Sequence, residues 1–483
     1  METLNRNNYK TGERPIKILQ FGEENFLRAF VDWILQNLND AGVICSDVAV
    51  VQPRPSGRVD KLAAQDGLYT VCLEGIDKGK KVQNKHIIDV LRDFINPFAQ
   101  YEKFLSYAES EELEVIISNT TEAGIVLDVS DTDFSVCPKS FPGKLLAFLK
   151  ARYDYFHGDI TKGLAVIPCE LIDHNGDELK KVLLKLAEIH YMEQDFINWL
   201  GKANHFTNTL VDRIVPGYPR DNAKEICEET GFLDNNIVKG EIFYLWVLQK
   251  EAFVQEKFPV DKSGLNIIFV EDITPYKQRK VKILNGLHTA MVPVAYLCGM
   301  DTVRESMLDP DIGKFIQELA NREIKPTIDL PQEQMDAFAK SVIERFINPF
   351  IRHELMSIAL NSTTKFKTRL LPTYNDYRRK FEKSPEYILF SLASQIVFYR
   401  GKRGEEEIAL NDAPEYLEFF RELWESGKDY MAMAEYVLAN ETLWGQNLAV
   451  GENVAFVAKY IERIVKDGER EALKAFLQAW SVA

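Results

Sequence analysis

The sequence predicts an α/β domain with a mostly parallel sheet, followed by an all-helical domain. In the first part of the chain, short runs of β-branched and other apolar residues alternate with helical patterns. This alternation is typical of a parallel sheet that helices cover on both faces. After about residue 274, strand-like runs almost vanish and helical periodicity dominates. We therefore predict one domain at residues 1–270 and a second at residues 271–483.

Five apolar runs are the predicted strands of the first domain. The first run is followed by Gly22 and a periodic helix from Phe26 to about Leu38, and the second is stopped by Pro53 and Pro55. The five runs lie at residues 16–21, 48–51, 113–118, 164–167 and 265–270. In the second domain, helical periodicity is clearest at residues 312–320, 332–346, 385–399, 413–424 and 453–465.

Composition and charge exclude several classes of protein. Lys and Arg number 58 and Asp and Glu number 73, and the resulting net charge of −15 disfavours general nucleic-acid binding. The six cysteines are scattered without CxxC or CxxH spacing, which argues against a zinc site or a disulfide framework and fits a reducing compartment. The longest apolar stretch, near residues 291–300, is far shorter than the roughly 20 residues of a membrane helix. We expect a cytoplasmic protein with no metal and no membrane or nucleic-acid partner.

The turn after the first predicted strand resembles a phosphate-binding turn with one departure. Gly22 suits the tight turn, but Glu24 stands where the second glycine of a GxG fingerprint is expected, and a carboxylate there adds negative charge beside a phosphate. Arg28, one helical turn later, is either a phosphate ligand or a surface residue. No acidic residue ends the second strand, where Gln52 and Arg54 stand instead, so the choice between NAD and NADP stays open.

Polar segments also follow the third and fourth predicted strands. Residues 118–124 carry Thr120, Thr121 and Glu122, which suit the hydroxyls of a ribose or sugar but equally a capped helix start. Residues 168–176 end in Asn175-Gly176, which is either an oxyanion donor or an ordinary Asn-Gly turn. Loops at the carboxyl ends of parallel strands are where such sheets place their chemistry.

The most informative segment follows Thr274-Pro275, which predicts the start of a helix. At 100° per residue, Asn285 lies about 140° and His288 about 80° from Lys280, whereas Lys282 lies at about 200°, outside that sector. An amine, an amide and an imidazole on one face suit carbonyl and alcohol chemistry, as proton donor, oxyanion donor and orienting group. The alternative is a surface lysine, a helix-end asparagine and a core histidine.

These segments together resemble the mannitol dehydrogenase family of polyol-specific long-chain dehydrogenases over nearly the whole chain. The pattern K-x4-N-x2-H at residues 280–288 is its most specific part. Further matching runs lie at residues 18–33, 118–125, 167–172, 210–215, 345–349 and 360–365. The resemblance implies a Rossmann-type first domain, a helical second domain, an active site between them, NAD as cofactor and no catalytic zinc.

The resemblance also implies residue roles. Lys280 is the expected acid/base, Asn175 and Asn285 hold the reacting oxygen, and His288 positions the substrate. The candidate cations for a substrate carboxylate are Lys365, Arg369 and Arg345. The expected cofactor-binding residues are Gly22, Glu24, Asn25, Phe26, Arg28, Gln52, Thr120, Thr121 and Glu122.

The reaction implied is reversible NADH-dependent reduction of D-tagaturonate to D-altronate, in a monomer or weak homo-oligomer. Ser357 stands where mannitol enzymes carry an arginine, and Cys169-Glu170-Leu171 replaces their Asp-Asn-Leu, so a sugar acid is favoured over a plain hexitol. The alternatives are reduction of fructuronate to mannonate and oxidation of another polyol or a sugar phosphate. A sugar-acid or nucleotide sensor that has lost catalysis is the alternative without enzymatic activity.

Overall fold

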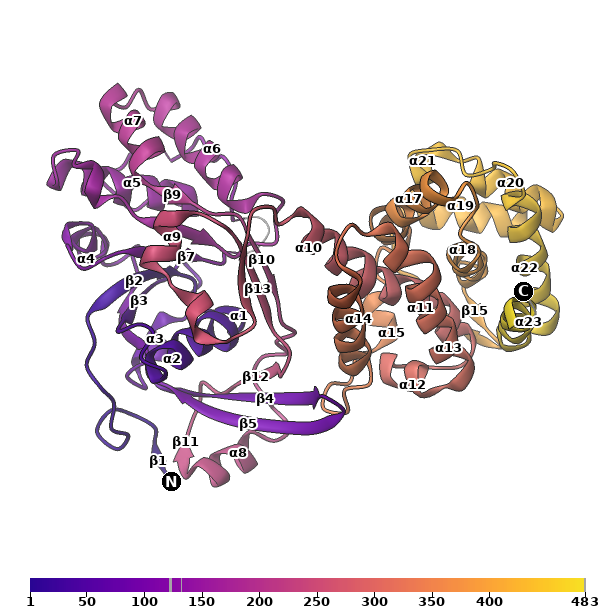
Figure 1. Cartoon of the computed structure of the whole chain (residues 1–483), viewed down its shortest axis with the longest axis horizontal. Helices are drawn as coiled ribbons and strands as arrows, with labels where there is room; N and C mark the ends of the chain where they lie inside the picture. Colours follow the sequence, from indigo (N-terminus) through magenta and orange to yellow (C-terminus); the bar gives the residue numbers. More distant parts are fainter. Residues whose placement is uncertain (121–123, 132, 482–483) are drawn as a thin grey trace. The chain divides into compact units, whose positions relative to one another are not determined.

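The computed structural model describes residues 1–120, 124–131 and 133–481, and the chain divides into two compact units. The first unit holds residues 1–74 and 81–273, and the second holds residues 75–80 and 274–483. The sequence placed the domain boundary at residues 270 and 271. Figure 1 shows a first unit built from strands and helices and a second unit built almost wholly from helices.

A six-stranded parallel sheet organises the first unit. Its order is β6-β3-β2-β7-β8-β9, which in chain order is third, second, first, fourth, fifth and sixth. This is the Rossmann order, and it reverses direction between β2 and β7. The strands are β2 (Ile16–Phe21), β3 (Asp47–Val51), β6 (Leu91–Ile95), β7 (Val115–Ser118), β8 (Ala165–Pro168) and β9 (His205–Phe206). The fold class predicted from the sequence is confirmed.

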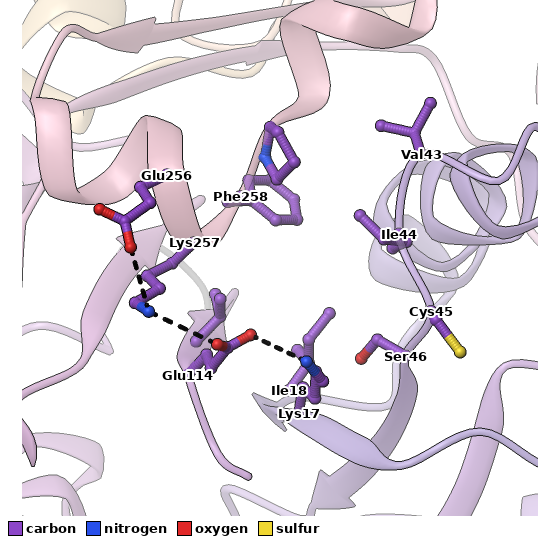
Figure 2. Close-up of a pocket in the computed structure, with 12 residues that line it drawn as sticks. Lys17, Ile18, Val43, Ile44, Cys45, Ser46, Glu114, Glu256, Lys257 and Phe258 are labelled. Atoms are coloured by element: carbon purple, nitrogen blue, oxygen red, sulfur yellow. Dashed lines mark hydrogen bonds and ion pairs between the residues drawn. The ribbon is translucent and has the colours of Figure 1, made fainter.

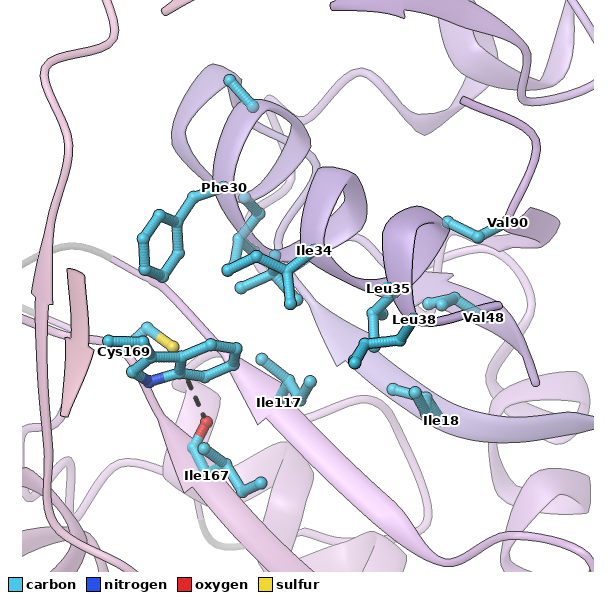
Figure 3. Packing of buried hydrophobic residues seen from close by; sticks show 14 of the residues in the cluster. Ile18, Phe30, Ile34, Leu35, Leu38, Val48, Val90, Ile117, Ile167 and Cys169 are labelled. Carbon is cyan, nitrogen blue, oxygen red and sulfur yellow. Dashed lines mark hydrogen bonds between the residues drawn. The ribbon is translucent and has the colours of Figure 1, made fainter. Parts of the chain in front are cut away.

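Alternating residues of these strands pack into two separate hydrophobic cores, because successive side chains of a strand point to opposite faces of the sheet. Ile18, Val48 and Ile117 belong to one hydrophobic cluster, and Leu19 and Ile116 belong to the other. Helix residues Phe30, Ile34, Leu35 and Leu38 cover the first face (Figure 3). Both faces are therefore buried, which explains the continuous apolar runs in the sequence.

Helices of the first unit connect these strands. A continuous helical segment follows β2, made of α1 (Asn25–Leu27), the π-helical η1 (Arg28–Asp32) and α2 (Trp33–Asp40). The α-helices after it are α3 (Val59–Ala63), α4 (Tyr101–Ser106), α5 (Phe141–Tyr155), α6 (Asn175–Ile189), α7 (Gln194–Ala203), α8 (Ala223–Thr230) and α9 (Ala252–Lys257). Residues of α4 to α7 pack into the second face of the sheet.

The fifth predicted strand does not join the main sheet. It forms β14 (Ile267–Val270), which pairs in parallel with β13 (Leu245–Gln249), and β13 pairs antiparallel with β10 (Thr209–Asp212). Hydrophobic periodicity identifies a strand but not its partner, so the pattern at residues 265–270 does not distinguish β14 from the strands of the main sheet. The five predicted runs also missed β6, β9, β10 and β13. Further strands of this unit outside the prediction are β1 (Glu2–Thr3), β4 (Tyr69–Asp77), β5 (Lys80–Ile88), β11 (Phe232–Leu233) and β12 (Val238–Glu241).

The second unit is helical but not all-helical as predicted. It contains a small hairpin of β15 (Lys402–Arg403) and β16 (Glu406–Glu407), together with residues 75–80 from the turn between β4 and β5. Within the unit, the Gly79 amide donates to Glu344 Oε1 at 3.1 Å. Its α-helices are α10 (Thr274–Arg279), α11 (Gly286–Leu297), α12 (Val303–Leu308), α13 (Pro310–Leu319), α14 (Gln332–Phe346), α15 (Leu355–Ile358), α16 (Ser362–Lys365), α17 (Leu371–Phe381), α18 (Glu386–Phe398), α19 (Pro414–Glu425), α20 (Tyr430–Leu438), α21 (Glu441–Trp444), α22 (Asn453–Asp467) and α23 (Glu469–Ser481).

Helix α18 is the centre of this unit, because all but its first residue, Glu386, are buried. It packs against α11 and α22, and Phe390 stacks on Phe476 of α23 with ring centroids 4.7 Å apart. Across the part of the chain that the structure describes, no helix combines the length and apolar character needed to cross a membrane.

Candidate functional site

The turn after β2 is built so that only glycine fits its first position. Gly22 has φ +127°, and a Cβ there would lie 2.6 Å from Leu27 Cδ1 and 2.9 Å from the Asn119 carbonyl oxygen. The turn stands where the strand order reverses between β2 and β7, which is where Rossmann sheets bind dinucleotides. The backbone cradle therefore fits a pyrophosphate.

Glu24 is accommodated in this turn without strain. Its φ of −77° and ψ of 170° are ordinary extended backbone, which a residue with a side chain adopts without strain. The side chain is half exposed, and its Oε1 lies 3.4 Å from Nη2 of Arg54 in the loop after β3. Of the two neighbouring predicted residues, Asn25 accepts a hydrogen bond from Arg28, and Phe26 stacks on Phe30 with centroids 5.1 Å apart.

The Arg28 guanidinium is bound inside the first unit. It is 9% exposed and donates to the Asn236 carbonyl at 2.6 Å and to Asn25 Oδ1 at 2.7 Å. Its carbon Cζ also lies over the Tyr69 ring, 5.2 Å from the centroid. These contacts hold η1 against the rest of the unit. Binding of a phosphate by Arg28 would require the guanidinium to give up one of them.

A buried carboxylate ties together the carboxyl ends of β7 and β8. Glu170 Oε1 accepts from the Thr120 amide and from Thr120 Oγ1, both at 2.9 Å, and Oε2 accepts from Ser118 Oγ at 3.0 Å. Burial raises the pKa of Glu170, while these hydrogen bonds oppose the shift. The hydroxyl of Thr120 is thus bound to Glu170. Thr121 and Glu122 lie outside the described residues.

Asn175 performs a similar task at the end of β8. It is fully buried, and its Nδ2 donates to the Pro168 carbonyl at 2.9 Å and to the Glu170 carbonyl and Thr209 Oγ1 at 3.1 Å. Its Oδ1 accepts from the Thr209 amide at 2.8 Å, which links β8 to β10. A substrate oxygen that binds this amide would have to replace one of these acceptors.

In the second unit, the predicted helix starts at Thr274 but does not continue as one α-helix. Residues Lys280–Asn285 form the π-helical segment η5, and α11 begins at Gly286. Hydrogen bonds in a π-helix run from residue i to i+5, so residues five positions apart come round to the same side. Lys280 and Asn285 are therefore closer to one face than the α-helical angle of about 140° predicted. π-Helical turns are rare and occur frequently at functional sites.

The two lysines of η5 have different environments. Lys280 is half-buried, and its ammonium lowers the pKa of Lys277, which burial also lowers. Lys282 is 3% exposed, and its Nζ donates to Asp376 at 2.6 Å and to the Thr327 carbonyl at 3.1 Å. The ion pair assigns Lys282 a structural role, whereas Lys280 and Asn285, at the two ends of η5, are both half-buried.

His288 is a buried neutral imidazole. Its ring lies 4.2 Å from the Phe346 ring and 5.0 Å from the His353 ring, centroid to centroid. Burial lowers its pKa well below the usual value, and the nearby positive groups His353, Arg345 and Arg369 lower it further. Among the described residues, Nε2 has no hydrogen-bond partner, while the ring bonds to the Leu284 backbone. Nε2 is thus left to accept a hydrogen bond.

The predicted substrate cations lie on the same group of elements. The π-helical segment η8 (Phe366–Leu370) carries Arg369 and packs against η5 and α11, where a Cβ on Gly286 would lie 3.5 Å from the Arg369 carbonyl. Lys365 donates to the Ile358 carbonyl at 2.7 Å, and burial followed by the charge of Arg369 lowers its pKa. Arg345 lies in the last turn of α14 and is 9% exposed.

Two family models match this chain. The mannitol dehydrogenase Rossmann domain covers residues 16–262, and the mannitol dehydrogenase C-terminal domain covers residues 272–465. The chain belongs to the mannitol dehydrogenase family. Membership of this family confirms the predicted class, an oxidoreductase that acts on CH–OH groups.

Relatives within the mannitol dehydrogenase family match over the full length. Altronate oxidoreductase of Bacillus subtilis strain 168 is 44% identical over 479 residues, which is 99% of this chain and 98% of the relative. The enzyme of the same name from Phocaeicola vulgatus is 43% identical over 480 residues, covering 99% of this chain and 100% of the relative.

Two solved structures share the fold of this chain. D-Sorbitol dehydrogenase in substrate-free form has a TM-score of 0.84 at 22% identity and covers 98% of this chain and 100% of its own. A ternary complex of Pseudomonas fluorescens mannitol 2-dehydrogenase with NAD and D-mannitol has a TM-score of 0.71 at 22% identity, with 99% of each chain covered.

Sequence reasoning missed three residues that the structure places in or beside these sites. Glu170 was noted only as a difference from polyol enzymes, and its position directly after a strand was the available signal. His353 lies outside any helical pattern, and nothing in the sequence links it to His288. Lys277 shares the helix start with Lys280, so its proximity could have been predicted from the three-residue spacing.

A cavity of about 390 Å³ lies at the opposite, amino-terminal edge of the main sheet (Figure 2). Its charged groups are paired with each other, since Glu114 lies 3.5 Å from Lys17 Nζ and 3.6 Å from Lys257 Nζ. None of the predicted site residues lines it.

Proposed function

We propose that this member of the mannitol dehydrogenase family catalyses the reversible NADH-dependent reduction of D-tagaturonate to D-altronate. The observation that carries the proposal is the π-helical segment η5, whose geometry brings residues five positions apart, such as Lys280 and Asn285, toward one side of the helix, three positions before His288. The full-length similarity to altronate oxidoreductases supports the substrate, and the glycine cradle after β2 supports a dinucleotide. The NAD named with the solved mannitol 2-dehydrogenase supports the choice of cofactor.

Lys280 is the acid/base of this proposal. NADH supplies a hydride to the keto carbon when it is bound, and Lys280 Nζ gives a proton to the oxygen that becomes the new hydroxyl. In the oxidative direction the neutral amine removes that proton again. A half-buried amine on a fixed helical turn is suited to this transfer, which typically contributes a factor of about 10² to 10⁴ in rate.

Asn285 and His288 hold the reacting end of the substrate. The Asn285 amide donates a hydrogen bond to the oxygen as negative charge develops on it. His288 is neutral, so its Nε2 accepts a hydrogen bond from a substrate hydroxyl rather than presenting a charge. Asn285 and His288 therefore orient the substrate as neutral groups, and Lys280 is the proton donor to the reacting oxygen.

The cations around His288 explain why the substrate is a sugar acid. Arg345 and Arg369 are the permanent charges that act on this imidazole, in a chain whose net charge is −15. Such a local positive field attracts an anionic substrate, and guanidinium groups bind carboxylates in two-point contacts. Ser357 is exposed and donates to the Glu354 carbonyl at 2.7 Å, so it provides no charge for a plain hexitol site.

The test is an absorbance assay at the NADH band with purified protein and D-tagaturonate, D-fructuronate and D-fructose in parallel. We expect NADH oxidation with tagaturonate to exceed that with fructuronate by about tenfold or more in kcat/KM, and fructose to give almost none. A preference for fructuronate would replace the substrate while keeping the reaction class. Absence of turnover with every sugar and either coenzyme would contradict the enzymatic proposal.

A further inference from the structure

The end of β3 lacks the acidic residue that usually binds the adenosine ribose in this fold. Gln52 stands there, but it is 2% exposed and its amide is used within the loop. Its Nε2 donates to the Arg54 carbonyl at 2.8 Å, and its Oε1 accepts from the Val59 amide at 3.5 Å. Gln52 therefore shapes the loop, and as a buried neutral amide it does not repel a 2′-phosphate as a carboxylate would.

The glycine turn supplies a carboxylate that fixes this loop from the other side. Glu23 is 5% exposed, and its Oε1 accepts from the Arg58 amide at 2.9 Å. A Cβ on Gly57 would overlap Gln52 and come within 2.5 Å of the same oxygen. The loop after β3 is thus closely packed against the turn after β2. The buried floor between them consists of Gln52 and Glu23, whose side chains hydrogen-bond to the backbone of that loop.

Glu24 and Arg54 form an exposed charged pair next to the buried side chains of Glu23 and Gln52. Their side chains are 53% and 55% exposed, and they lie 3.4 Å apart. Their charges both act on Glu23, which places them beside the buried floor. An exposed ion pair of this length is weak, so either partner is readily released to a ligand.

We propose that Glu24 and Arg54 form the coenzyme-selecting pair of this protein, with Glu24 as acceptor for the ribose 2′-hydroxyl of NADH. This inference rests on the proposed function, because it requires a bound nicotinamide dinucleotide. The carboxylate repels the 2′-phosphate of NADPH, and its negative charge offsets the attraction that the neighbouring Arg54 exerts on that phosphate. The residue that departs from the glycine fingerprint thereby replaces the acid missing from the end of β3.

The test is a titration of the full chain with NADH and with NADPH, followed by the change in protein and coenzyme fluorescence. For the wild type we expect NADH to bind more tightly than NADPH. Glu24→Gln should weaken NADH several-fold and tighten NADPH about tenfold, because Arg54 is released toward the 2′-phosphate. The double variant with Arg54→Gln should lose the gain for NADPH. Glu111→Gln, which removes another exposed carboxylate paired with a lysine at 3.5 Å, is the matched control and should change neither affinity.

The outcomes separate this inference from the proposed function. Tighter NADH binding by Glu24→Gln with NADPH unchanged would mean that the carboxylate faces the pyrophosphate, and it would overturn the inference. Unchanged affinities, or a wild type that prefers NADPH, would overturn it equally. A wild type that binds neither coenzyme would contradict the proposed function itself. Circular dichroism of each variant verifies that an altered affinity does not come from unfolding.

Discussion

The predicted site residues of the two units differ in burial and in their hydrogen bonding to the protein. At the carboxyl edge of the sheet, Asn175 and Thr120 are buried and bonded to protein atoms, so they hold strand ends together. In the second unit, the helix that carries Lys280, Asn285 and His288 leaves two of them half-buried and one ring nitrogen without a partner among the described residues. Strand ends expose backbone groups that neighbouring side chains must satisfy, whereas a helix satisfies its own backbone, so its side chains are not needed for that purpose.

The largest expected effect contrasts the two lysines of η5. Lys280→Ala should lower kcat by about 10³-fold with little change in NADH affinity or thermal stability, because only the proton transfer is removed. Lys282→Ala is the matched control, and it should lower stability, since it removes a buried amine that donates to Asp376 at 2.6 Å and to the Thr327 carbonyl at 3.1 Å. Steady-state kinetics, NADH titration and thermal unfolding of both variants make the comparison. Near wild-type turnover in Lys280→Ala would remove the lysine from the mechanism.

The next contrast concerns a buried carboxylate in each unit. Glu170 accepts three hydrogen bonds, whereas Glu469 accepts one from Ser394 Oγ at 2.7 Å, and its burial raises the pKa to about 8. Because the folded state holds this proton more tightly than the unfolded state, Glu469 stabilises the fold least at high pH. Its stability contribution is lost as the pH rises from about 4.5 to about 8.

Glu469→Gln should therefore raise the free energy of unfolding at pH 9 by a few kcal/mol and flatten its pH dependence between pH 5 and 9. Glu170→Gln should instead destabilise the protein, since an amide cannot accept on both sides. Denaturant unfolding at several pH values measures both. A Glu469→Gln variant with the pH dependence of the wild type would show that this carboxyl does not titrate in that window.

The asparagines give a third contrast. Asn175→Ala removes a fully buried amide with several partners and should cost about 2 to 3 kcal/mol of stability. Asn285→Ala should leave stability within about 0.5 kcal/mol and lower kcat by about 10²-fold. The two variants are compared by unfolding and by turnover. If Asn175→Ala kept full stability and lost activity, the amide would have to serve the substrate as the sequence predicted.

The smallest expected effect concerns substrate charge. Arg369→Gln should raise KM for the sugar acid about tenfold, with kcat changed much less, because a carboxylate contact lowers the energy of both the bound substrate and the transition state. An Arg400→Gln variant, whose residue lies over the Trp424 ring at 5.9 Å in the same unit, serves as control. An unchanged KM for Arg369→Gln would assign the carboxylate to Arg345 or Lys365.

The fold followed from the sequence more fully than the site did. The runs at 16–21, 48–51 and 113–118 are apolar on both faces, and that property alone predicts a covered parallel sheet. The pattern could not predict that β14 pairs with β13, since periodicity contains no information on partners. The π-helical turn at Lys280–Asn285 also lacked a signal, because one extra residue per turn leaves the local composition unchanged. The burial of Asn175 depends on Thr209, which is 34 positions away.

Chemical rescue tests the role of Lys280 most directly. Methylamine, added to Lys280→Ala, should restore NADH oxidation in proportion to its concentration, because a free amine then donates the proton that the side chain supplied. Methylamine should not increase turnover of the wild type or of Lys282→Ala. A Lys280→Ala variant that turns over tagaturonate at the wild-type rate without any added amine would contradict the account.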